Sequence, residues 1–293
     1  MPVIAVVNRK GGSGKSTVAA HLAAWCAHNG NAVMLGDVDR QQSTRSWLRR
    51  RSQELPAIAA WTVDQTILRV PTGITHVILD TPGGMHGFDL ARMVMFADVI
   101  VMPVCSSSFD RESAAACHAE LMTLPRVSSG RCKLASIAMR IDARTTATQV
   151  MKDWSAGLGM HFLGALRDTQ LYVQCLERGM TIFDLSPQRA ASDLLQWQPI
   201  LDWISAQQGP VQASSPAAAP RTRPSPGQLA SSLPDNLMPA QKSMVAGDRM
   251  TVARTDRVAN SPVRKVVATA ASRPMQSDSQ TQQIPSFLKL VKC

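Results

Sequence analysis

Asn8-Arg9-Lys10-Gly11-Gly12-Ser13-Gly14-Lys15-Ser16-Thr17 stands near the start of this 293-residue chain, between two segments of different character. Before it, residues 2–8 form an apolar run of β-branched residues that is typical of a central parallel strand. After it, Ser16–Asn29 is rich in alanine and has helical composition. Glycines between a strand and a helix let backbone N–H groups converge on phosphate oxygens, so the stretch predicts a phosphate-binding loop.

The side chains of this loop refine the prediction. Lys15 is expected to reach the β- and γ-phosphates, and the Ser16 hydroxyl to complete a Mg²⁺ shell. The usual pattern G-x-x-x-x-G-K-[ST] requires glycine where this chain has Arg9, and the chain matches K-G-G-x-G-K-[ST] instead. At average residue usage, a chance match has a probability on the order of 10⁻⁴. The alternative is a glycine-rich turn that binds nothing.

Two further apolar segments end in carboxylates. The segment Ala32–Asp37 leads into Asp37-Val38-Asp39, and His76–Thr81 carries Asp80 at its end. Mg²⁺ prefers carboxylate and water ligands in octahedral geometry, so an acid here can hold a metal-bound water opposite Ser16. Each segment alone is a weak signal, but in this order after a phosphate loop they indicate a Mg²⁺–nucleotide site.

Apolar strand-like and helical segments alternate through the first 208 residues. This alternation predicts an α/β fold: a mostly parallel sheet with helices on both faces and ligands at the carboxyl ends of the strands. The expected strands are 2–8, 32–37, 76–81, 98–104, 132–141 and 160–165. The expected helices are 16–29, 43–51, 88–96, 110–123, 145–156, 170–178 and 191–207.

Composition excludes several other classes of protein. Six cysteines lie far apart without a C-x-x-C pair, which argues against a zinc ribbon or a disulfide scaffold and suits a reducing compartment. No apolar run approaches the ~20 residues that span a bilayer, and the N-terminus lacks the basic region of a secretory signal. We therefore expect a cytoplasmic protein.

The net charge of +10 is unevenly divided. Residues 1–208 hold 20 Lys/Arg against 17 Asp/Glu (+3), and residues 209–293 hold 11 against 4 (+7). The second part also has ten of the 18 prolines and Phe287 as its one aromatic residue. We predict a folded α/β domain at 1–208 and a disordered basic tail at 209–293, which is either a solvated linker or a contact with polyanions such as DNA.

The chain resembles a known family, the ParA/MinD-type ATPases. Lys10–Ser16, Asp37-Val38-Asp39 and Asp80-Thr81-Pro82-Gly83 look like its deviant Walker A, Walker A′ and Walker B motifs. The resemblance continues through Met102-Pro103-Val104 to Ser108 and Asp110, and through Arg167-Asp168 and Gly179–Asp184. It covers about residues 2–207 and is nearest to the small ParA partition proteins.

The resemblance implies ATP and Mg²⁺ as cofactors and assigns roles to residues. Lys10 would be the signature lysine that reaches the partner's phosphates in an ATP-sandwich homodimer, and Asp39 would position or activate the hydrolytic water. Asp37 and Asp80, with Ser16, would support Mg²⁺, and Thr17 would touch the α-phosphate. The nucleotide-binding residues would be Gly11, Gly12, Ser13, Gly14, Lys15, Ser16 and Thr17.

Two positions depart from the family pattern. Arg40 stands where the family usually has proline, which puts the rigidity of that loop in doubt. The strand that commonly ends in Asn-Arg beside the adenine reads Ala138-Met139-Arg140, so no adenine-reading asparagine is carried over.

By this resemblance the function would be ATP-driven partition or positioning of plasmid or chromosomal DNA, or of another large cargo, on the nucleoid. Partners would be DNA bound without sequence preference and a ParB-like or other adaptor protein. One alternative is a MinD-like membrane-surface ATPase, for which 285–293 would be a short apolar and basic helix. The other is a nucleotide-switched scaffold with little hydrolysis.

Candidate DNA contacts are basic side chains whose individual roles are open, because charged surface residues are usually only solvated. They are Arg49, Arg50, Arg51, Arg140, Arg144, Lys152, Arg167, Arg178 and Arg189.

Overall fold

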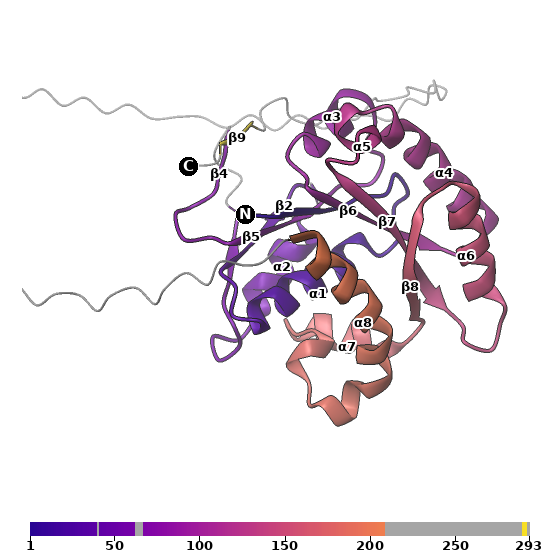
Figure 1. Ribbon diagram of the computed structural model, residues 1–293. Coiled ribbons are helices and arrows are strands. Elements are labelled where there is room, and N and C mark those ends of the chain that lie inside the picture. Colours follow the sequence, from indigo (N-terminus) through magenta and orange to yellow (C-terminus); the bar gives the residue numbers. More distant parts are fainter. Residues whose placement is uncertain (40, 62–66, 209–288, 292–293) are drawn as a thin grey trace, which may run out of the picture. The chain divides into compact units, whose positions relative to one another are not determined.

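The computed structural model describes residues 1–39, 41–61, 67–208 and 289–291. Its centre is a seven-stranded parallel sheet with strand order β3-β2-β5-β1-β6-β7-β8 (Figure 1). The strands are β1 (Val3–Val6), β2 (Val33–Asp37), β3 (Ile58–Ala60), β5 (His76–Asp80), β6 (Val99–Cys105), β7 (Lys133–Ile141) and β8 (His161–Arg167). The predicted α/β class with a parallel sheet is confirmed.

Helices cover both faces of the sheet (Figure 1). One face packs against α1 (Lys15–His28), α2 (Ser43–Arg50), α7 (Gln170–Glu177), the 3₁₀ turn η1 (Ile182–Asp184) and α8 (Pro187–Gln208). The other packs against α3 (Gly87–Val94), α4 (Ser108–Met122), α5 (Pro125–Ser128) and α6 (Ala147–Gly157). Since each strand is buried on both sides, β1 reads as a continuous apolar run instead of an alternating one.

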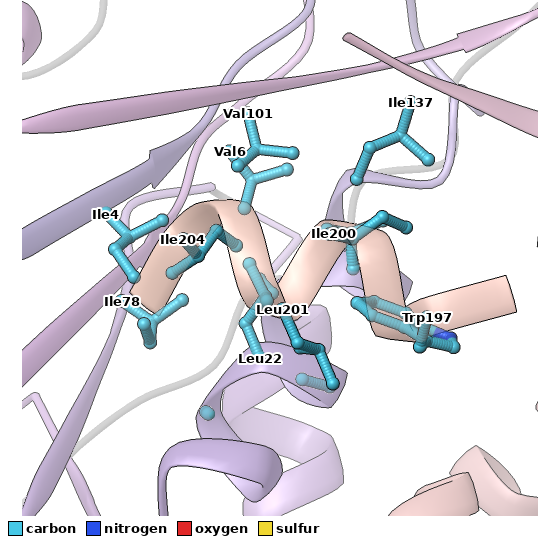
Figure 2. Close-up of a cluster of buried hydrophobic side chains, with 14 of the residues drawn as sticks. Ile4, Val6, Leu22, Ile78, Val101, Ile137, Trp197, Ile200, Leu201 and Ile204 are labelled. Atoms are coloured by element: carbon cyan, nitrogen blue, oxygen red, sulfur yellow. The ribbon is translucent and has the colours of Figure 1, made fainter. Parts of the chain in front are cut away.

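Helix α8 closes the first of these faces. Figure 2 shows Trp197, Ile200 and Ile204 of α8 lying among side chains of α1 and the central strands. All three are fully buried. Burying a large apolar side chain stabilises a fold by about 1.5–3 kcal/mol, so α8 is an integral part of the domain.

The structure differs from the sequence-based prediction at short elements. Strand β3 was not predicted, because at this sheet edge its three residues are half-buried or exposed and carry no apolar alternation. Helix α5 was also missed, and α8 begins at Pro187, four residues earlier than expected. Proline suits the first turn of a helix, where its missing N–H leaves no partner unsatisfied.

Most of the predicted tail lies outside the described residues, and so do Arg40 and residues 62–66. Within the last nine residues, Lys289–Val291 forms a short strand, β9, which pairs in parallel with β4 (Ile67–Arg69). The helix expected at 285–293 is therefore wrong for these three residues. In the described ranges, no helix is both long and apolar enough to cross a bilayer.

Candidate nucleotide-binding site

Strand order brings the predicted site residues to one edge of the sheet. Strand β5 lies between β2 and β1, and Asp80 at its end is in register with Asp37 on one side and Val6 on the other. The loops that follow β1, β2 and β5 therefore leave the sheet side by side at its carboxyl edge. Parallel α/β sheets bind their ligands at this edge.

The loop between β1 and α1 has the conformation that its glycines permit. Gly12 and Gly14 have φ values of 76° and 94°, a region that favours glycine, and Gly14 is the N-cap of α1. A Cβ atom added at Gly11 or Gly12 would meet no atom within 4 Å. At Gly14 an added Cβ would lie 2.8 Å from Met139 Cε. The loop is therefore open at Gly11 and Gly12 and closely packed at Gly14, just before the helix N-terminus where a phosphate group would bind.

Lys15 lies beneath this loop. Its side chain is buried, and its Nζ donates a hydrogen bond of 2.9 Å to the carbonyl of Lys10. Burial lowers the pKa of Lys15, while the nearby carboxylates of Asp80 and Asp39 act in the opposite direction. A buried ammonium group beside an open anion-binding loop can exchange its carbonyl partner for phosphate oxygens.

Asp80 is fully buried, and within the described residues neither of its carboxylate oxygens has a partner with good hydrogen-bond geometry, although the Ser16 hydroxyl lies close to it. Burial raises its pKa to about 7, although the Ser16 hydroxyl and Lys15 oppose this effect. Buried polar groups are almost always paired, so an orphaned carboxylate needs an explanation. A Mg²⁺ ion beside Ser16 would supply the missing partner.

In the described part of the chain, no group of three or more His, Cys, Asp or Glu side chains is placed to hold a metal ion. Mg²⁺ differs from zinc in this respect, because it binds through one or two protein ligands and takes the rest of its shell from water and substrate phosphates. The donors present thus fit a nucleotide-bound Mg²⁺ ion.

Asp37 and Asp39 have different environments. The carboxylate of Asp37 is buried and accepts hydrogen bonds from Thr44 Oγ1 and Arg45 N, both at 2.9 Å, and from Asp39 N at 3.1 Å. Asp37 thus fixes the start of α2, and a contact with Mg²⁺ stays a prediction. Asp39 is half-buried and accepts a bond from the backbone of Gln41.

Lys10 is paired within its own chain. Its Nζ lies 2.7 Å from Asp110 Oδ1 in the first turn of α4, and its backbone N–H donates to Asn8 Oδ1. Burial alone would raise the pKa of Asp110, but hydrogen bonds from Lys10 and Ser107 outweigh this effect and lower it. Asp110 was quoted in the family resemblance, but nothing in the sequence indicated this ion pair.

Two candidate DNA contacts form ion pairs with buried carboxylates. Arg51 has a side chain only 5% exposed, and it forms two 2.9 Å hydrogen bonds with the fully buried carboxylate of Asp184. Arg167 makes a similar pair with buried Asp193, at 2.8 Å for both bonds. The prediction is corrected for Arg51, which is withdrawn from the surface, whereas Arg167, with a side chain 39% exposed, stays a candidate. The exposed candidates are Arg49, Arg50, Arg140, Arg144, Lys152, Arg178 and Arg189.

Comparison with known proteins identifies the class. The family model "CobQ/CobB/MinD/ParA nucleotide binding domain" matches residues 4–182, more than half of the chain. The chain therefore belongs to this family, and the predicted membership among ParA/MinD-type deviant Walker A proteins is confirmed.

Two curated proteins and one solved structure are examples of what the chain is similar to. "Maintenance of carboxysome distribution protein A" of Gloeobacter kilaueensis is 36% identical over 111 residues, covering 37% of this chain and about half (51%) of that protein. The protein of the same name from Halothiobacillus neapolitanus is 25% identical over 198 residues, covering 65% of this chain and 91% of that protein. A solved ATP complex of McdA from Cyanothece has the same fold, with a TM-score of 0.53 at 13% identity over 68% of this chain and 96% of that chain.

Proposed function

We propose that this chain is a Mg²⁺-dependent ATPase that forms an ATP-sandwich homodimer and positions a large cargo. Hydrolysis of ATP to ADP and phosphate, stimulated by a partner protein, would drive the cycle. The observation that carries this proposal is the buried, unpartnered carboxylate of Asp80 next to Lys15, beneath a glycine loop that is open to an anion.

The residues at the carboxyl edge of the sheet would have separate roles in nucleotide binding and hydrolysis. Lys15 and the N–H groups of residues 11–17 would bind the phosphates, and Thr17 would contact the α-phosphate. Ser16 and Asp80 would hold Mg²⁺, with support from Asp37; when bound, the ion neutralises charge on the β- and γ-phosphates. Asp39 would orient the attacking water.

Lys10 has a separate role in this proposal. As the signature lysine it would reach the nucleotide of the partner subunit. To do so it must leave Asp110, which holds its ammonium group at 2.7 Å. Charge favours this exchange of one carboxylate for a triphosphate, because the triphosphate offers more negative charge.

The cargo of this protein and the DNA surface on which it would act are inferred from the names of its relatives and from its charge. Two relatives are named for carboxysome distribution, and the family includes ParA. Residues 209–293 carry +7 of the net charge of +10, which favours contact with DNA without sequence preference. We infer a cytoplasmic, nucleoid-associated protein that moves DNA or a protein organelle through a ParB-like or other adaptor.

Binding assays separate this function from its alternatives. The full chain is mixed with random-sequence duplex DNA or with vesicles containing anionic lipid, with and without MgATP, and Lys15→Ala serves as the nucleotide-blind control. We expect MgATP to increase DNA binding at least tenfold in the wild type only. ATP-dependent binding to vesicles instead of DNA would indicate a MinD-like protein. ATP binding without turnover would indicate a scaffold.

A further inference from the structure

Arg9 and Glu120 form an ion pair that no motif predicted. Arg9 stands directly before Lys10 in the phosphate loop, and its guanidinium bonds to Glu120 near the end of α4, 111 residues away in sequence. The Nε of Arg9 is buried without a hydrogen-bond partner in the described structure. The side chains are 33% and 25% exposed, so both are largely withdrawn from water.

Glu120 also binds a second element. Its other carboxylate oxygen accepts a hydrogen bond from the backbone N–H of Gly87, the first residue of α3. The first N–H groups of a helix have no partner within the helix, and a carboxylate there is favoured by the helix dipole. One carboxylate on α4 therefore joins the phosphate loop to the start of α3.

The loop of residues 81–87, between Asp80 and α3, touches the phosphate loop directly as well. The N–H of Gly84 donates to the carbonyl of Arg9. A Cβ at Gly83 would lie 3.4 Å from the backbone of Gly11, so a side chain there would press on the phosphate loop. The phosphate loop and the 81–87 loop are thus joined by the hydrogen bond of Gly84 and by the shared contacts of Glu120, and they pack closely at Gly83.

We propose that Glu120 is a positioning residue that transmits nucleotide binding from the phosphate loop to the 81–87 loop and α3. This inference rests on the proposed function, because it needs an anionic nucleotide in the loop. The negative phosphates attract Arg9, and since Arg9 and Gly87 share one carboxylate, a shift of the guanidinium displaces the start of α3. Phe88, 78% exposed, follows Gly87 and would move with it.

Hydrogen exchange of the full chain tests this coupling. Exchange is measured with and without Mg²⁺ and a non-hydrolysable ATP analogue in the wild type, Glu120→Gln and Glu112→Gln; Glu112 is an exposed acid on the same helix. In the wild type and Glu112→Gln, the analogue should slow exchange in both 10–17 and 81–92. In Glu120→Gln, protection of 10–17 should persist, while the response of 81–92 falls at least threefold.

A second variant keeps the test decisive if Glu120→Gln folds poorly. Arg9→Gln breaks the same ion pair from the other side, leaves the Gly87 bond intact, and should weaken the response of 81–92 in the same way. A full response of 81–92 in either folded variant with nucleotide bound would overturn the role of Glu120. Failure of the analogue to protect 10–17 in the wild type would contradict the proposed function itself.

Discussion

Asp39 lies two residues beyond the end of β2, half-buried and close enough to Lys15 to influence its pKa. If it positions the attacking water, Asp39→Ala should bind ATP normally but lower kcat by about 100-fold or more. Steady-state phosphate release, measured beside ATP affinity, checks this. Asp153→Ala, which removes an exposed acid on α6, is the control and should leave both quantities unchanged. Unchanged turnover in Asp39→Ala would indicate that another group positions the attacking water.

At the residue scale, the sequence predicted those site residues that local spacing brings together. Lys15 and Ser16 begin α1 directly after the glycine loop, and Asp80 ends the strand β5, which pairs with β1 before that loop, so motif and topology were sufficient to bring them together. The pairs Lys10–Asp110 and Arg9–Glu120 could not be predicted, because each joins residues about a hundred positions apart. The same limit explains Arg51: its buried partner Asp184 is 133 positions away.

Among the elements, α1 meets α7, η1 and α8 at His21, which is fully buried. Its Nδ1–H donates to the carbonyl of Thr17 at 2.7 Å, its Nε2 accepts the N–H of Ile182, and its ring stacks on Trp197. Burial lowers the pKa of His21 to about 4, so the imidazole is neutral in the folded protein at neutral pH.

A pH dependence of stability follows from His21. In the unfolded chain His21 binds a proton near pH 6.5 and in the folded chain only near pH 4, so stability present above pH 6.5 is lost as pH falls between these values. The loss is on the order of 3 kcal/mol. Urea unfolding at several pH values should show this decline in the wild type and in the exposed-site control His86→Gln. His21→Gln should be less stable at pH 7 and show a flatter profile; an equally steep profile would contradict the assignment.

The contact between the end of α2 and η1 depends on one buried carboxylate. Asp184 accepts bonds from Arg51, His28 and Thr181, and these hold its pKa at about 2 despite burial. Removing one partner of a buried ion pair costs about 3–5 kcal/mol. Arg51→Ala should therefore lower the free energy of unfolding by several kcal/mol, while Arg49→Ala, at an exposed position two residues earlier in α2, should change it little. Equal effects of the two substitutions in denaturant titrations would refute a special role for Arg51.

Helices and strands that bury much apolar surface were predictable from the sequence, whereas those that bury little were not. The six long strands and most helices carry that pattern, whereas β3 and α5 are held mainly by their neighbours. Lys289–Val291 shows the same limit, since its strand conformation depends on β4, a segment more than 200 positions away.

At the scale of the whole molecule, most of the net charge lies in residues 209–293, whereas the proposed nucleotide site lies in residues 1–208. Deleting 209–293 removes +7 of +10 and none of the proposed nucleotide site. The truncated chain should bind ATP, while its DNA affinity falls and becomes less dependent on salt. The slope of log affinity against log salt concentration should become shallower by roughly 0.9 for each DNA phosphate that the tail neutralises in the full chain. Fluorescence anisotropy over a salt series measures this slope. An unchanged slope would make the tail a linker.

The central claim is that ATP, bound between the phosphate loop and Asp80, joins two chains through Lys10. Analytical ultracentrifugation of Asp39→Ala and of Lys10→Ala/Asp39→Ala, each saturated with MgATP, tests it most directly. The account predicts that Asp39→Ala sediments at twice the 31.7 kDa chain mass with MgATP and as a single chain without it. The double variant should bind ATP and stay a single chain. A single-chain Asp39→Ala at full ATP occupancy, or a double variant that dimerises normally, would contradict the account.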